Sequence, residues 1–222
     1  MFRSFGYWLA QPATRLNLLV LGLTAMFVAC FLVWLPGPGV GLQLIGMEIG
    51  EWIKFLGVGP RRDLFYLPPI ALGLVLGLWT AFWPNNWRAW LARLLAVGAA
   101  MLAFPAIAAI TLEPRSEWLL RVVLIGTVAA VAVAAAVLAA RQPKPWLWLV
   151  MAAVAASSAI VPTWQYLAVL PVVRAVLRES IGVGPGVWLN VAGGLLVAAI
   201  CAVEFQRARQ TKTAASAAAV VE

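Results

Sequence analysis

Long apolar runs, separated by short polar segments, dominate this chain of 222 residues. A helix that spans a bilayer needs about 20 mostly apolar residues. Six runs suit such helices: Asn17–Leu35, Leu64–Trp83, Ala89–Ile110, Trp118–Ala140, a run from Trp146 that ends between Val161 and Leu170, and Gly186–Phe205. The fifth is the least regular, because Pro162 kinks or ends a helix. The pattern predicts an all-α fold, a polytopic integral membrane bundle of about six transmembrane helices.

The first apolar run also resembles the apolar core of a secretory signal. It is longer than the usual core of about 7–15 residues, and no small-residue cleavage site follows it. We therefore expect an uncleaved membrane anchor.

Two connections, at about 37–63 and 163–184, are long enough to hold structure of their own. Wound as a helix, Val40–Leu56 places Glu48, Glu51 and Lys54 on one face and apolar residues largely on the other. This pattern is typical of an amphipathic helix that lies on the membrane or caps a bundle. Pro171–Ser180 is a shorter version. We expect one or two amphipathic interfacial helices.

Composition supports the membrane class, since 64% of the residues are hydrophobic and 11% are charged, against about 25% charged residues in soluble proteins. The mean hydropathy is +0.95. The net charge of +8 is spread thinly between apolar runs. Its basic residues therefore mark topology rather than a nucleic-acid interface, and no nucleic-acid partner is expected.

The charges favour one orientation. With the N-terminus inside, nine Lys and Arg residues lie inside and seven outside, while six of the eight acidic residues lie outside. Lys and Arg set orientation, so we expect both termini in the cytoplasm. The expected parts are a cytoplasmic segment 1–16, the bundle 17–205 and a disordered tail 206–222 whose basic start suits anionic headgroups. The Ala-, Val-, Leu- and Arg-rich composition suggests a bacterial cytoplasmic membrane.

Two glycine-proline motifs recur. GPGV occurs at Gly37–Val40 and Gly184–Val187, and GVGP at Gly57–Pro60 and Gly182–Pro185. A phosphate-binding loop needs a Lys and a Ser or Thr after its glycines, and neither GPGV copy has them, so we interpret these stretches as boundaries between elements. The GVGP parallel is consistent either with a duplicated unit or with coincidence in a composition rich in these residues.

The chain has no histidine, and its two cysteines, Cys30 and Cys201, lie inside apolar runs without metal-binding spacing. The commonest transition-metal ligand and the usual haem ligand are therefore missing. We expect no cofactor, no metal site and no disulfide between these two cysteines, since they lie towards opposite leaflets.

Small and polar residues inside the spans are the candidate sites. Gly73 and Gly77 form a GxxxG pattern, and Gly193 and Gly194 lie in the last span. Such residues let helices approach closely, either within the bundle or against another protein's helix. We interpret them as packing positions.

Asn190 and Arg121 are candidate polar groups at membrane depth. We expect Arg121 to extend to the outer boundary and pair with Glu117, and Asn190 to hydrogen-bond between helices. A substrate role is the alternative for both. The outer carboxylates Glu48, Glu51, Asp63 and Glu113 are the candidates for acid–base chemistry. We interpret their spacing as that of a solvated helix face, which disfavours catalysis.

The sequence favours a non-catalytic membrane protein, an accessory subunit that packs against other membrane proteins or itself. The alternative is a binder or carrier of lipid or another apolar molecule, with the outer amphipathic helix as its lid. A membrane enzyme is the third possibility, and it would require the outer carboxylates to converge on a cleft. An apolar pocket beneath Val40–Leu56 would favour the binder, and a filled core the subunit.

Overall fold

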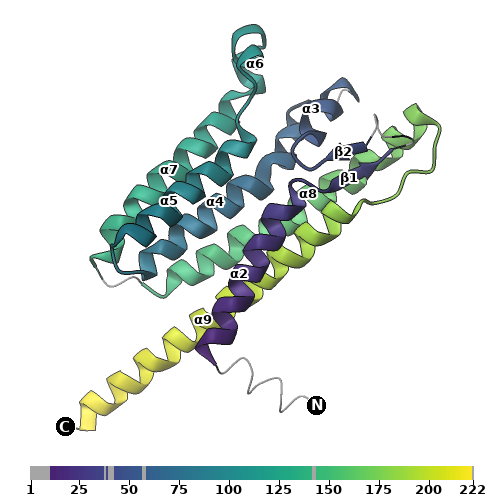
Figure 1. The fold of residues 1–222 in the computed structure, drawn as a ribbon. Coiled ribbons are helices and arrows are strands. Elements are labelled where there is room, and N and C mark those ends of the chain that lie inside the picture. The colour runs from purple at the N-terminus through teal and green to yellow at the C-terminus, as the bar shows by residue number, and fades with distance from the viewer. Residues whose placement is uncertain (1–10, 38, 40–42, 57–58, 142–143, 222) are drawn as a thin grey trace, which may run out of the picture.

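The computed structural model describes residues 11–37, 39, 43–56, 59–141 and 144–221, which form a helical bundle with one small sheet (Figure 1). Its elements are α2 (Pro12–Ala29), β1 (Val33–Pro36), β2 (Gln43–Ile45), α3 (Ile49–Ile53), α4 (Leu67–Trp79), α5 (Trp87–Ala100), α6 (Ile107–Leu112), α7 (Leu119–Ala139), α8 (Trp146–Leu177) and α9 (Pro185–Val221). Short 3₁₀ turns join several of them: η2 (Lys54–Leu56), η3 (Gly59–Tyr66), η4 (Thr80–Phe82), η5 (Met101–Ala103) and η6 (Arg115–Glu117).

Within the described residues, five helical stretches are long and apolar enough to cross a membrane, which indicates a multi-pass membrane protein. They are Pro12–Ala29, Arg61–Phe82, Leu119–Ala139, Trp146–Leu177 and Pro185–Thr211. The stretch that contains α4 is the most enclosed, with 72% of its apolar window buried, against 22% for α7. Helix α4 packs against α2, α5, α7 and α8, and α9 runs along α2 and α8. A helix that is apolar on all sides belongs at such a centre.

The third predicted span, Ala89–Ile110, is not one helix. Helix α5 ends at Ala100, and an extended break at Phe104–Ala106 precedes α6. Pro105 explains the break, because proline has no N–H to donate and pushes the preceding residue out of the helical region. Phe104 accordingly has ψ of 132°. The two pieces together still run from one end of the bundle to the other (Figure 1).

The predicted amphipathic helix Val40–Leu56 is also wrong as a single helix. The structure has strand β2, helix α3 and turn η2 in this range, and Val40–Leu42 lie outside the described residues. Strand β2 pairs antiparallel with β1, which follows α2 directly, with Leu35 opposite Leu44. The aromatic and β-branched residues of β1 suit a strand. The first apolar run therefore ends as a helix at Ala29 and continues as a strand.

Helix α8 continues through both of its prolines, Pro162 and Pro171, to Leu177. The segment Pro171–Ser180 is therefore the end of this helix rather than a separate amphipathic one. Pro162 deprives the carbonyl of Ser158, four residues earlier, of its usual N–H partner. Asn190 of α9 supplies the missing donor, since its Nδ2 lies 2.9 Å from that carbonyl oxygen. The expected hydrogen bond between helices is present, and it allows α8 to stay helical.

Helix α9 continues to Val221, so the structure places a helix where a disordered tail from residue 206 was expected. The start of α2 and the end of α9 lie towards the same end of the bundle (Figure 1). There, Arg15 of α2 forms an ion pair with Glu204 of α9.

The second GPGV stretch serves close packing as well as the start of α9. Its Gly184 donates its N–H to the carbonyl of Trp34 at 2.9 Å, and a Cβ at Gly184 would overlap the carbonyl oxygen of Val33. A Cβ at Gly186 would overlap the buried Trp34 indole. Glycine is therefore required here because strand β1 approaches so closely. In the first copy, Pro38 and Val40 lie outside the described residues.

The bond between α8 and α9 predicts a specific pattern of coupling. Asn190→Ala leaves the Ser158 carbonyl unpaired, and we expect a loss of about 0.5–2 kcal/mol in the free energy of unfolding in detergent micelles. Pro162→Ala restores an N–H to the helix, so Asn190→Ala should have a smaller effect in that background. Ser157→Ala, at an exposed neighbouring position, is the control. Equal effects of Asn190→Ala in both backgrounds would contradict this account.

Candidate functional site: a buried ionic network

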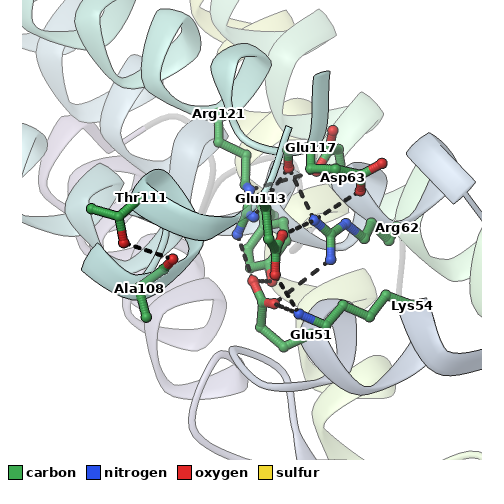
Figure 2. A network of polar contacts seen from close by, with 10 residues as sticks. Glu51, Lys54, Arg62, Asp63, Ala108, Thr111, Glu113, Glu117 and Arg121 are labelled. Carbon is green, nitrogen blue, oxygen red and sulfur yellow. Dashed lines mark hydrogen bonds and ion pairs between the residues drawn. The ribbon is translucent and has the colours of Figure 1, made fainter. Parts of the chain in front are cut away.

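The largest group of charged side chains lies at the end of the bundle that carries α3 and α6 (Figures 1 and 2). Four separate segments contribute to this ionic network: α3 with η2, η3, the stretch from α6 to η6, and α7. Its members are Glu51, Lys54, Arg62, Asp63, Tyr66, Glu113, Glu117 and Arg121. These contacts fix the short outer elements to the ends of α4 and α7.

Arg121 of α7 is one centre of the network, and its side chain is only 1% exposed. Its Nη1 lies 2.8 Å from Glu51 Oε1, and its Nε lies 3.6 Å from Asp63 Oδ1. Its Nη2 donates to the backbone carbonyl of Glu117 at 3.3 Å. The guanidinium also lies over the ring of Tyr66, at 4.4 Å from the centroid. Arg121 therefore pairs chiefly with α3, instead of extending to the surface and pairing with the Glu117 carboxylate.

Arg62 of η3 is the second centre and is equally buried, at 1% exposure. Its Nη2 lies 3.2 Å from Glu113 Oε2 and 3.0 Å from Glu117 Oε2, and its Nη1 lies 3.7 Å from Glu51 Oε2. The charge of a buried arginine is tolerated only where carboxylates surround it. Arg62 therefore holds the outer segments against the start of α4.

Lys54 lies on the more exposed side of the network. Its Nζ lies 2.8 Å from Glu113 Oε1 and 3.3 Å from Glu51 Oε2. With Arg62 and Arg121 it brings three cations against the four carboxylates, so the network carries one net negative charge when all of them are ionised. Figure 2 shows these side chains converging from α3, η3, η6 and α7.

The environment fixes the charges of the outermost members. Burial alone would raise the pKa of Glu51, but hydrogen bonds from Tyr66 and Arg121 and the charges of Arg121 and Arg62 lower that pKa to about 2. The hydrogen bond from Lys54 lowers the pKa of Glu113, and the same contact raises the pKa of Lys54. These groups keep their charges at neutral pH, which disfavours a role in proton transfer.

Several polar atoms in the network lack a hydrogen-bond partner among the described residues. They are Arg62 Nε and Nη1, Asp63 Oδ1, Arg121 Nε and the indole nitrogen of Trp118. The contact between Arg121 Nε and Asp63 Oδ1 is an ion pair too long for a hydrogen bond. Among the described residues, no group of three or more Cys, Asp and Glu side chains is placed to hold a metal ion.

The sequence identified only part of this network. Glu51 and Lys54 belong to it, but Glu48 is exposed and takes part in none of the ion pairs formed by the described residues. Arg62 and Tyr66 were missed. The one sequence signal for Arg62 is a charged residue directly before an apolar run, and that position looks the same as an ordinary topology marker.

The four candidate packing glycines all lie against neighbouring helices. A Cβ at Gly73 would lie 2.6 Å from the Ala96 carbonyl oxygen of α5. One at Gly193 would lie 2.8 Å from the Gly22 carbonyl oxygen of α2. The nearest atoms to such a Cβ at Gly194 and Gly77 belong to α8 and α7. The structure therefore uses these positions for contacts inside the bundle.

One small cavity lies beneath the described part of the outer segment. The cavity there has a volume of about 10 Å³ and is lined by residues from α2 to α4, including Trp34, Gly46, Met47, Phe65 and Tyr66. A cavity of that size holds at most one water molecule. Cys30, which also lines it, and Cys201 are both free and buried.

Comparison of the chain with models of known protein families, with curated proteins and with solved structures gave no match.

The low pKa of Glu51 predicts that part of the protein's stability is lost at acid pH. A carboxylate with a lowered folded-state pKa stabilises the fold above its ordinary value of 4.5, and this contribution disappears as the pH falls towards about 2. Glu51→Gln should therefore lower the unfolding temperature in detergent at pH 7, and the difference from wild type should shrink between pH 4.5 and 2. Glu48→Gln is the matched control on the same segment. A difference for Glu51→Gln that stays constant over this range would refute the role of its charge.

Proposed function

We propose that this protein is a non-catalytic integral membrane subunit that packs against other membrane proteins or a second copy of itself. The observation that carries the proposal is the cavity of about 10 Å³ beneath the outer segment. A lipid binder with this segment as its lid needs room for an apolar ligand, and ligand pockets usually measure about 300–1,000 Å³. The small size of this cavity among the described residues disfavours a lipid binder that uses the outer segment as its lid.

The ionic network supports the same proposal. Its carboxylates are held by Arg62, Arg121 and Lys54, and an enzyme needs an acid or base that changes its protonation during the reaction. The fixed charges of Glu51, Lys54 and Glu113 instead give the outer end a defined shape. We therefore propose that its role is structural.

Helix α7 offers a face for a partner. Its Gly126, Ala130 and Ala134 are exposed at intervals of four residues, and no atom lies within 4 Å of a Cβ built at Gly126. Small residues at this spacing allow another helix to approach closely in a membrane. We further propose a bacterial cytoplasmic membrane with both termini in the cytoplasm, since the first two turns of α5 and the α7–α8 connection at that end carry basic residues and no acidic ones.

The test is native mass spectrometry of the protein extracted gently from its own cytoplasmic membrane fraction. A C-terminal green fluorescent protein, which fluoresces only in the cytoplasm of bacteria, reports the orientation in the same cells. We expect a stoichiometric complex, which Gly126→Leu should weaken about tenfold or more by filling the helix contact. Gly98→Leu, at an equally open glycine of α5, is the matched control and should leave the complex intact.

A lone chain that carries a defined lipid-sized mass would overturn the proposal and favour the lipid binder. A complex that Gly126→Leu leaves intact would place the partner on another face than α7.

A further inference from the structure

Arg93 of α5 is another buried arginine, at the end of the bundle opposite the ionic network. It is 2% exposed. Its Nε donates to Thr80 Oγ1 at 3.1 Å and its Nη1 to Asn85 Oδ1 at 2.8 Å, and its guanidinium lies 4.9 Å from the centre of the Trp90 ring. All of these neighbours are neutral. Its Nη2 has no hydrogen-bond partner among the described residues.

Arg93 differs from Arg62 and Arg121 in the groups that surround its charge. Those two arginines are also buried, but each lies beside carboxylates. None of the ion pairs formed by the described residues includes Arg93. A buried cation without a counter-charge is strongly destabilising. Because the described residues supply no negative charge at Arg93, an anion bound from outside the chain would offset its charge.

The surroundings of Arg93 attract anions. Residues 64–112 and 118–178 contain no Asp or Glu, while α5 and the α7–α8 connection carry four basic residues: Arg88, Arg93, Arg141 and Lys144. The turn between η4 and α5 also presents the N-terminus of a 14-residue helix, where free N–H groups and the helix dipole favour negative charge.

The position of the guanidinium matches the headgroup layer of a membrane. Arg93 lies in the second turn of α5, but its side chain reaches back to Asn85, before the helix begins. Trp87 and Trp90 are 69% and 46% exposed beside it, and exposed tryptophans are typical of the membrane–water interface. Rotation of the half-exposed Trp90 indole would open the guanidinium to an incoming headgroup.

We propose that the α4–α5 turn binds the phosphate of an anionic phospholipid headgroup, with Arg93 as the buried anchor and Arg88 as an outer contact. The occupant is a lipid rather than free phosphate, because the cation sits at the end of an apolar bundle between interfacial tryptophans. The Thr80 hydroxyl holds the guanidinium in place, since it donates to the Gly77 carbonyl at 2.7 Å and accepts from Arg93. This site does not depend on the proposed accessory function.

The test is lipid binding by the full chain in a neutral detergent, followed by native mass spectrometry and by the unfolding temperature. Phosphatidylglycerol, phosphatidylcholine and inorganic phosphate are added separately. We expect phosphatidylglycerol to bind about tenfold more tightly than phosphatidylcholine and to raise the unfolding temperature. Arg93→Gln should remove this preference, and Arg93→Lys should keep most of it. Arg141→Gln, an exposed arginine at the same end, is the matched control and should keep it.

Asn85→Asp keeps the proposal testable if Arg93→Gln does not fold. It places a carboxylate against Arg93 Nη1 and supplies the missing charge within the chain, so the protein should fold and lose its preference for phosphatidylglycerol. Retention of the preference in Asn85→Asp or in a folded Arg93→Gln would overturn the proposal. An equal loss in Arg141→Gln, equal binding of phosphatidylcholine, or equal stabilisation by inorganic phosphate would overturn it as well.

Discussion

The ion pair between Arg121 and Glu51 is the contact on which the outer end of this protein depends. A guanidinium that is withdrawn from water requires a negative charge beside it, and Arg121 receives one from a segment 70 positions earlier in the chain. Arg62 is also withdrawn from water, and it pairs with Glu113 and Glu117. These two sets of ion pairs hold α3 and η6 over the ends of α4 and α7. These charges position the short outer elements together with the buried side chains of Ile49 and Ile53 in α3.

The same constraint operates inside the spans, where no water is available to satisfy a polar group. Pro162 leaves a carbonyl of α8 without its N–H partner, and Asn190 of α9 provides the donor. Because the partner comes from the neighbouring helix, the packing of α8 on α9 and the continuity of α8 are linked. Gly184 and Gly186 permit the close approach of strand β1 to the start of α9. The packing of these two elements is linked in the same way.

The sequence predicts the apolar helices because hydrophobic length is a local property. It does not predict what each proline does: Pro105 breaks a helix, whereas Pro162 and Pro171 do not. It also does not predict the ionic network. The charges of Val40–Leu56 indicate an amphipathic helix when they are considered alone, but Glu51 and Lys54 face partners on η3, α7 and the end of α6. Such pairings depend on tertiary structure.

The most direct test of this account is the coupling between Glu51 and Arg121, measured by equilibrium unfolding of the full chain in detergent micelles at pH 7. Arg121→Gln, Glu51→Gln and the double variant complete the cycle with the wild type. If the pair holds the outer end, Glu51→Gln should destabilise the wild type more than it destabilises Arg121→Gln. The two losses in the free energy of unfolding should differ by at least about 1 kcal/mol. Effects that add within about 0.5 kcal/mol would show that the two charges act independently, and would contradict the central claim.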